Sequence, residues 1–332
     1  MEVKQNDEKS LVKRIVMKST LAVFVSVVVM NVFVLLTMGA FILVDAVKNS
    51  GSLDEISQFM NHVALLDGME IVQRYGSSGI GYLISIVVAA LLFCLIFRKH
   101  VSLRDIFVED EKMTAGIFIA CLLIFYAIQL PTEVMNFSME KLLNLFGLTS
   151  QIGQELGSGA VGSVTMGIYV CLGAPIAEEL LYRGFIMNSL KKYGVNFAIV
   201  ISALFFGLMH MNLIQSIAAV FVGLMLGYVA MRYSIKWSMA LHIFSNTFSV
   251  GMTYLATRFF GDQQMAVALV LEIIIFAAGL FMLVKAWNKI RTFVKANKSE
   301  GIKYKWAFSS KLFIFYIVFC LFFAFRVIQV IK

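Results

Sequence analysis

Charged residues, prolines and paired cysteines are all scarce in this chain. Of its 332 residues only 14% are charged and only two are proline, whereas 60% are hydrophobic. Soluble globular domains carry about a quarter of charged residues. The composition therefore excludes a soluble globular protein and indicates a protein that crosses a membrane several times. The sequence contains no internal repeat, low-complexity segment or separate soluble domain, so we treat residues 1–332 as a single integral membrane domain.

The cysteines and the net charge exclude further classes. The four cysteines lie in apolar runs without a CxxC spacing, and we interpret them as small core residues rather than disulfides or metal ligands. The net charge of +8 does not indicate a nucleic-acid partner, because the basic residues gather in loops, as membrane orientation requires. The first apolar run, 20–44, is too long for the core of a signal peptide, so we expect a first membrane helix.

Long apolar segments divide the chain into predicted membrane helices. Lipid forces backbone hydrogen bonds to close within each segment, so all of them are expected to be helical. The sequence predicts an all-α bundle of about eight or nine membrane helices around an intramembrane cavity. A tight helical hairpin is expected at Met211-Asn212. The segments are 20–44, 79–97, 114–131, 159–177, 196–210, 213–231, 237–256, 265–284 and 312–330.

The loops alternate between basic and acidic along the chain. The N-terminal tail is basic, as are the loops around 98–104, 191–192, 232–236 and 285–311, whereas the intervening loops are acidic on balance. Basic loops lie on the cytoplasmic side of membrane proteins. We therefore expect a multi-pass protein of the cell (plasma) membrane, with a cytoplasmic N-terminus and a C-terminus outside. The 285–311 loop could also bind anionic lipid, but topology alone accounts for its charge.

Several polar side chains lie at membrane depth. Glu178 and Glu179 are adjacent in an otherwise apolar span, and His210, His242 and Asn246 lie in later spans. An ionisable side chain in hydrocarbon costs a few kcal/mol even on forgiving scales, so it is a functional hypothesis by default. Carboxylate, imidazole and amide groups that are buried together predict a site that carries out a chemical reaction.

The two glutamates are expected to have different roles. Glu179 and Arg183 are four residues apart, so they share a helix face and can form an ion pair. Glu178 points about 100° away and has no such partner in the sequence, which makes it a candidate general base. Pro175 is expected to loosen the helix just before Glu178 and to free backbone carbonyls near the site.

His242 and Asn246 also share one helix face. Together they are suitable donors to a developing oxyanion, although a hydrogen bond between helices is the simpler role for either residue alone. Ser245 lies on a different face, and we interpret it as packing. Glu272 is a lone carboxylate in the eighth span; it could snorkel to the interface, pair with a distant arginine or line the cavity.

These residues form three motifs that resemble those of a known family. In chain order the motifs are Glu178-Glu179-x-x-x-Arg183, Phe206-x-x-x-His210 and His242-x-x-x-Asn246. In order and spacing they are similar to the motifs of the CAAX-protease and bacteriocin-processing intramembrane proteases, also called the Abi or type II CAAX prenyl endopeptidase family. The resemblance covers a catalytic core of about 160–255. The remaining spans contribute to the resemblance only through the number of helices.

The resemblance implies an intramembrane endopeptidase. Glu178 would activate a water, helped by His210, while His242 and Asn246 would stabilise the oxyanion and Glu179 and Arg183 would support the site. Members of the family have been described both as metalloproteases and as metal-free glutamate proteases. We expect no cofactor, because a zinc bound by Glu178, His210 and His242 would leave only the paired Glu179 as base. That zinc site is the alternative.

The expected partners are a peptide or protein substrate and the lipid bilayer, with no nucleic acid. A peptide, leader or prenylated substrate would fit the resemblance; the sequence does not give the substrate or the oligomeric state. Two other classes stay open. One is a non-catalytic immunity or peptide-binding membrane protein, and the other is a proton-coupled transporter that uses Glu178 and the histidines as a relay.

Overall fold

The computed structural model describes residues 2–66, 68–76, 78–101, 106–150, 163–260, 264–326 and 328–330. It is 85% helical, which confirms the all-α class. Within the described ranges, the only sheet is one antiparallel pair, β1 (Leu148–Thr149) and β2 (Gln329–Val330).

The described part of the chain consists almost entirely of helices. In chain order they are α1 (Glu2–Lys48), α2 (Leu53–Leu65), α3 (Gly68–Tyr75), α4 (Ile80–Phe97), α6 (Ala115–Tyr126), α7 (Gln129–Asn144), α9 (Val164–Ile168), η1 (Tyr169–Gly173), α10 (Ala174–Glu179), η2 (Leu180–Met187), α11 (Asn188–Leu190), η3 (Lys191–Tyr193), α12 (Val195–Leu208), α13 (Leu213–Arg232), α14 (Ile235–Phe260), α15 (Gln264–Ala296), α16 (Gly301–Phe308) and α17 (Lys311–Arg326).

Fewer helices qualify as membrane spans than the sequence predicts. Six described helical segments are long and apolar enough to cross a membrane, and a seventh qualifies if α16 and α17, bent by 74°, form one span. The chain is thus a multi-pass membrane protein, but the count of eight or nine is not confirmed. The shortfall has a physical cause. α12 is apolar but has only 14 residues, and α14 carries the polar stripe of Ser238, His242 and Asn246.

The predicted segments fall mainly on helices, and the larger differences lie at their ends. The eighth segment was expected to end at 284, whereas α15 continues to Ala296. The ninth was expected to reach 330, whereas α17 ends at Arg326 and residues 329–330 belong to β2. Residues 159–162, at the start of the fourth segment, lie outside the described residues. The third segment was expected to end at 131, whereas its helical span continues through α7 to Asn144. Glu133, which was expected in an acidic outer loop, therefore lies on a helix within this span.

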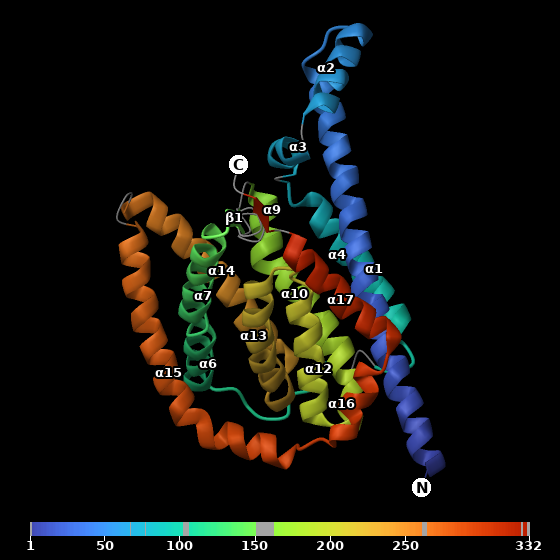
Figure 1. Cartoon of the computed structure of the whole chain (residues 1–332), viewed down its shortest axis with the longest axis vertical. Helices are drawn as coiled ribbons and strands as arrows, with labels where there is room; N and C mark the ends of the chain where they lie inside the picture. Colours follow the sequence, from blue (N-terminus) through green and yellow to red (C-terminus); the bar gives the residue numbers. More distant parts are fainter. Residues whose placement is uncertain are drawn as a thin grey trace.

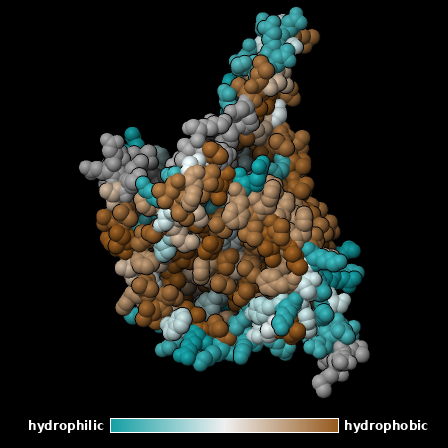
Figure 2. Space-filling view, in the orientation of Figure 1, coloured by the Kyte–Doolittle hydropathy of each residue, from teal (hydrophilic) through white to brown (hydrophobic). Residues whose placement is uncertain are grey.

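The long helices α1 and α15 lie on opposite flanks of the bundle, with α10, α12 and α13 between them (Figure 1). The two termini lie at opposite ends of the bundle in the same view. Figure 2 shows a broad hydrophobic band around the middle of this face and hydrophilic groups at both ends. This distribution is the one expected of a bundle whose middle faces lipid.

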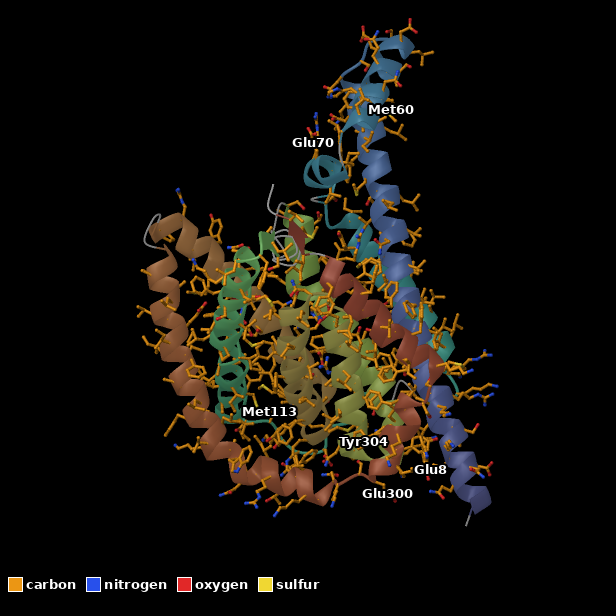
Figure 3. The ribbon with its side chains drawn as sticks, in the orientation of Figure 1. Glu8, Met60, Glu70, Met113, Glu300 and Tyr304 are labelled. Atoms are coloured by element: carbon orange, nitrogen blue, oxygen red, sulfur yellow. The ribbon has the colours of Figure 1, made fainter. Side chains whose placement is uncertain are left out.

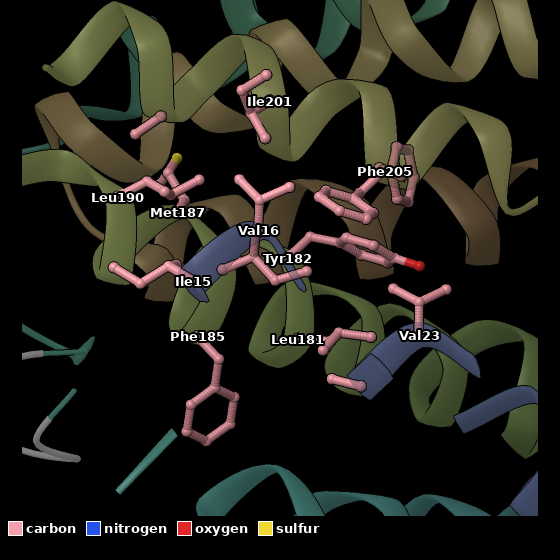
Figure 4. Close-up of a cluster of buried hydrophobic side chains, with 14 of the residues drawn as sticks. Ile15, Val16, Val23, Leu181, Tyr182, Phe185, Met187, Leu190, Ile201 and Phe205 are labelled. Atoms are coloured by element: carbon pink, nitrogen blue, oxygen red, sulfur yellow. The ribbon is translucent and has the colours of Figure 1, made fainter. Parts of the chain in front are cut away.

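The main core lies where α1, η2 and α12 meet (Figure 4). Ile15 of α1, Tyr182 of η2 and Ile201 and Phe205 of α12 are each fully buried there. α17 closes this side, because the Tyr316 hydroxyl donates to the Phe205 carbonyl at 3.1 Å. The helix that carries the two glutamates is therefore held on several sides by packed side chains.

Small residues bring α12 and α13 close together. A Cβ atom on Gly223 would lie 3.0 Å from the Cα of Ala203, and one on Gly227 would lie 3.0 Å from the Ile199 side chain. The Gly223-x-x-x-Gly227 pattern therefore permits close packing of the two helices. The packing fixes the hairpin that carries His210.

An ion pair also fixes the charged end of the N-terminal helix. Glu8 of α1 forms an ion pair with Lys303 of α16 at 2.8 Å. Figure 3 shows Glu8, Glu300 and Tyr304 near the same end of the molecule, while Met60 and Glu70 lie at the other end. The basic C-terminal segment and the N-terminal tail thus share one end.

Candidate active site

The two glutamates lie on a helix that changes its winding twice. From Val164 to Tyr193 the chain forms one helical segment, in which the π-helical turns η1 and η2 flank the short α-helix α10. Such π-helical turns are rare and are frequently found at functional sites. Pro175 stands at the start of α10, where it was expected to loosen the helix.

The loosening leaves one carbonyl for another helix. In η1 the backbone N–H of Ala174 donates to the carbonyl of Tyr169, five residues earlier. In the same register the Val170 carbonyl would accept a hydrogen bond from the backbone N–H of residue 175. Residue 175 is a proline and has no N–H. The Asn246 Nδ2 donates to this Val170 carbonyl instead, at 3.0 Å. Pro175 and Asn246 are thus complementary: the proline exposes the acceptor and the asparagine joins α14 to it.

Glu179 is the centre of a fully buried network. Its Oε1 atom accepts from Arg183 Nη1 at 2.7 Å, and both side chains are 0% exposed. The expected pairing of Glu179 with Arg183 is therefore present. The Ser238 hydroxyl donates to Glu179 Oε2, and His242 Nδ1 lies 3.1 Å from Oε1. Arg183 also donates through Nη2 to the Gly223 carbonyl of α13, at 3.2 Å.

His242 lies between the two glutamates. Its Nδ1 faces Glu179, and its Nε2 lies 3.7 Å from Glu178 Oε2. The sequence offered no partner for Glu178, because this neighbour comes from α14 and not from its own helix. The Glu178 side chain is 21% exposed, compared with none for Glu179. Of the two carboxylates, only Glu178 is therefore open to a reactant.

His210 lies in the predicted hairpin. α12 ends at Leu208, Met211 has a left-handed backbone with φ 49°, and the Asn212 side chain caps α13 by accepting from the Gln215 N–H. His210 Nδ1 lies 2.9 Å from the Phe206 carbonyl. If Nδ1 donates there, Nε2 of the neutral ring is left as an acceptor. Among the described residues, no hydrogen bond or ion pair joins His210 to Glu178.

The Phe206 ring connects the two histidines. Its centroid lies 5.2 Å from the His210 ring and 5.8 Å from the His242 ring, edge to face in both cases. The guanidinium of Arg183 lies over the same ring at 4.5 Å. The first residue of the second motif therefore acts as a spacer that both imidazoles and the buried arginine contact.

A small cavity lies beside Glu178. It has a volume of about 80 Å³ and is lined by α1, α4 and the glutamate helix. A cavity needs only about 10–15 Å³ of this kind of volume to hold one water molecule. The polar side chains that line it include Glu178, Tyr169, Tyr182, Ser26 and Ser85. The site can therefore accommodate water next to the exposed carboxylate.

The candidate zinc ligands do not form a ligand set. Among the described residues no three or more His, Cys, Asp or Glu side chains are grouped so that they could hold a metal ion. Glu178 and His242 are neighbours, but His210 is turned to its own helix. The residues as placed do not fit the zinc alternative, and the absence of a cofactor stays a prediction.

Sequence reasoning missed two contributors to the site. Ser238 is fully buried and holds the second oxygen of Glu179. It precedes His242 by four residues, so the polar stripe Ser238, His242 and Asn246 was visible in the spacing. The Val170 carbonyl had no sequence signal beyond Pro175. Ser245 was interpreted as packing; it is buried, and its carbonyl accepts from the Tyr126 hydroxyl at 2.8 Å.

Comparison with known proteins identifies the segment that carries this geometry. Residues 160–248 match the family described as "Type II CAAX prenyl endopeptidase Rce1-like". No curated protein and no solved structure matches the chain. The matched segment contains all three motifs, from Glu178 to Asn246, and agrees with the resemblance expected over about 160–255. Within a multi-pass helical membrane protein, residues 160–248 are thus an Rce1-like segment, similar to a family of endopeptidases.

Proposed function

We propose that this chain is an intramembrane endopeptidase that hydrolyses a peptide bond with a water activated by Glu178. The observation that carries the proposal is the unequal placement of the two glutamates. Glu179 is enclosed by Arg183, Ser238 and His242, whereas Glu178 borders a cavity large enough for water. A carboxylate that is both open and close to a fixed imidazole suits general acid–base chemistry. The family match supports peptide-bond hydrolysis.

In the proposed reaction Glu178 takes a proton from the water as the water oxygen attacks the scissile carbonyl carbon. The tetrahedral oxyanion is stabilised by hydrogen-bond donors, and the protonated Glu178 then gives its proton to the leaving amine. The balance is one water consumed, one carboxylate product and one amine product. No acyl-enzyme forms, because no serine or cysteine serves as nucleophile.

His242 and Asn246 are the proposed oxyanion donors. Asn246 Nδ2 has two hydrogens, and its bond to the Val170 carbonyl uses one of them. His242 Nδ1 faces Glu179, so in the oxyanion role the ring carries hydrogens on both nitrogens and donates from Nε2. His210 is proposed to assist Glu178 after the Nε2 side of its ring turns to the water.

Localisation and orientation are also proposals. We place the protein in the cell membrane with its N-terminus in the cytoplasm. The support is the shared basic end formed by the N-terminal tail and the segment after α15, where Glu8 pairs with Lys303. Cytoplasmic loops of membrane proteins carry the excess of lysine and arginine.

The test is cleavage in proteoliposomes. A pooled set of prenylated and unprenylated peptides would be incubated with the wild type, Glu178→Gln and His210→Ala, each with and without a metal chelator. We expect Glu178→Gln to lose about 10²–10⁴-fold in rate, the range that general acid–base catalysis contributes. Asp54→Asn, a change at an exposed carboxylate of α2, is the control and should keep the wild-type rate.

Two outcomes would contradict the proposal. Undiminished cleavage by Glu178→Gln would exclude the glutamate as base. Cleavage that the chelator removes and zinc restores would mean that Glu178, His210 and His242 rearrange into a metal site.

A further inference from the structure

A second and much larger cavity lies between α14 and α15, and it shares no lining residue with the cavity beside Glu178. It has a volume of about 580 Å³ and is formed by residues of α6, α7, α14 and α15. In Figure 1, α15 is the outermost helix on this flank and α7 lies next to it. Pockets of about 300–1,000 Å³ accommodate ligands of drug-like size. The cavity beside Glu178 is too small for that, so a peptide needs a further binding surface.

Most of the lining is apolar. Met252 and Leu255 of α14 and Leu271 and Ile275 of α15 face the space. Aromatic rings add to this wall, with Tyr126 and Phe248 5.0 Å apart between ring centroids. A surface of this kind fits an apolar segment of a ligand.

Two carboxylates break the apolar lining. Glu133 of α7 and Glu272 of α15 both line the cavity, and each lies within a helix that qualifies as a membrane span. Among the described residues, neither Glu133 nor Glu272 forms an ion pair. Carboxylates at membrane depth are costly unless a cation or a polar group faces them. The charge of the cavity is therefore complementary to a cationic ligand.

Tyr126 joins the lining of the cavity to the helix that carries the proposed oxyanion donors. This residue lines the cavity, and its hydroxyl donates to the carbonyl of Ser245 at 2.8 Å. The next residue is Asn246, which is bonded to Val170 on the glutamate helix. A segment bound in the cavity would thus contact α14 at Phe248 and Ser249, two and three residues after Asn246.

From this arrangement we infer that the cavity binds an apolar segment of the peptide substrate, and that Glu133 and Glu272 select a lysine or arginine side chain within it. The inference rests on the proposed protease function and names its substrate class. An apolar, positively charged segment satisfies both parts of the lining at once: the hydrocarbon wall contacts its side chains, and the two carboxylates accept hydrogen bonds from its cation.

The experiment measures binding separately from cleavage. The full-length chain with Glu178→Gln would be placed in nanodiscs of phosphatidylcholine, so that bound peptide is not cut. The probes are a fluorescein-labelled alanine–leucine peptide with a single lysine and the same peptide with norleucine in place of the lysine. Fluorescence anisotropy gives both dissociation constants. We expect the lysine peptide to bind at least about tenfold more tightly, as for a partly buried charge pair.

The variants assign the preference to the cavity. Glu133→Gln and Glu272→Gln should each reduce the preference for lysine, and the double variant should abolish it while keeping the affinity for the norleucine peptide. Asp54→Asn, which removes an exposed carboxylate outside the cavity, should leave the preference unchanged. Because glutamine keeps the shape of glutamate, a loss of folding would show as a loss of both affinities.

Three results would overturn the inference. The first is equal affinity for the two peptides, and the second is a preference that survives in the double variant. The third is loss of the preference when phosphatidylethanolamine replaces phosphatidylcholine, which would assign the carboxylates to a lipid amine. Failure of the protease function has a different signature, because lysine-selective binding would persist while the wild type cleaves no peptide.

Discussion

At the scale of single residues, the site depends on how one histidine is held. His242 contacts Glu179 through Nδ1 and faces Glu178 through Nε2. Glu179 can orient the ring only because its own two oxygens are fixed, one by Arg183 and the other by Ser238. Side chains that position a catalytic group in this way support it without touching the substrate.

Ser238→Ala tests this chain of contacts. Removing the hydroxyl leaves one oxygen of a buried carboxylate without its donor, and hydrogen bonds to charged groups contribute about 1.5–3 kcal/mol. Because about 1.4 kcal/mol corresponds to a factor of ten, we expect kcat to fall about tenfold or more. KM should change little. The measurement is steady-state cleavage in proteoliposomes, and Ser238→Thr should restore most of kcat.

The matched control is Ser202→Ala. Ser202 is equally buried and donates to the Tyr182 carbonyl at 2.8 Å, but it does not contact either glutamate. If Ser202→Ala and Ser238→Ala lowered kcat and thermal stability to the same degree, Ser238 would be a packing residue and not a positioning one.

The same residues show what the sequence could predict. The pair of Glu179 with Arg183 lies within one helix, so the four-residue spacing alone was sufficient to predict it. The contacts of His242 with the glutamates and of Asn246 with Val170 join different helices. Their geometry depends on how α14 packs against α10 and η1, which no periodicity in a single sequence determines. For that reason the position of His242 between the two glutamates was not predicted.

At the scale of elements, the helix with the two glutamates owes its shape to Pro175 and the π-helical turns beside it. Regular α-helical winding throughout would engage each carbonyl of the helix internally. The π register together with the missing proline N–H leaves the Val170 carbonyl for Asn246. Local sequence thus creates the acceptor that a distant helix uses.

Pro175→Ala would supply the missing N–H. We expect the new N–H to compete with Asn246 for the Val170 carbonyl, so that the helix regularises and Asn246 loses its anchor. Thermal stability should stay equal or rise, since alanine favours a helix interior by about 3 kcal/mol over proline, whereas the cleavage rate should fall. The melting temperature would be measured on the detergent-solubilised protein, and the cleavage rate would be measured after reconstitution of the same preparation into proteoliposomes.

Asn246→Ala is the companion variant for this prediction. It removes the donor and leaves Pro175 in place, so it should lower the rate as well. A Pro175→Ala protein that cleaves at the wild-type rate would contradict the link between the helix distortion and the site.

Length and polarity explain where the prediction of elements was incomplete. Each apolar run was found, because hydrophobicity over a membrane-length segment is a strong signal. The predicted end of the third span, at residue 131, was wrong, because α7 continues to Asn144 through a stretch that contains Glu133. A carboxylate usually indicates the end of a span, and here it lines a cavity instead.

At the scale of the whole molecule, the chain forms a bundle in which α1 and α15 flank a centre of shorter, more buried helices. The helices that surround the glutamates are the ones most enclosed by protein, and the long flanking helices have exposed apolar surfaces. The termini lie at opposite ends of this bundle.

Opposite placement of the termini leads to a topology prediction. With a cytoplasmic N-terminus, Lys303 and the rest of the basic segment should also be cytoplasmic, whereas the α2–α3 segment should be outside. Single cysteines at Lys9, Lys298 and Asp54, introduced into a chain whose four native cysteines are replaced, would be probed in intact cells with a membrane-impermeant thiol reagent.

Only the cysteine at position 54 should be labelled before the cells are opened. Labelling at position 9 or 298 in intact cells would reverse the proposed orientation. The result does not depend on catalysis, so it tests the arrangement of the molecule separately from its chemistry.

The central claim is that Glu178 performs the chemistry while its neighbour Glu179 supports the structure. The most direct measurement is the cleavage rate and the melting temperature of Glu178→Gln beside those of Glu179→Gln. We predict that Glu178→Gln loses cleavage and keeps the wild-type melting temperature, while Glu179→Gln melts at a lower temperature because Arg183 is left as an unpaired buried charge. Cleavage that persists in Glu178→Gln, in a protein that melts like the wild type, would contradict the account.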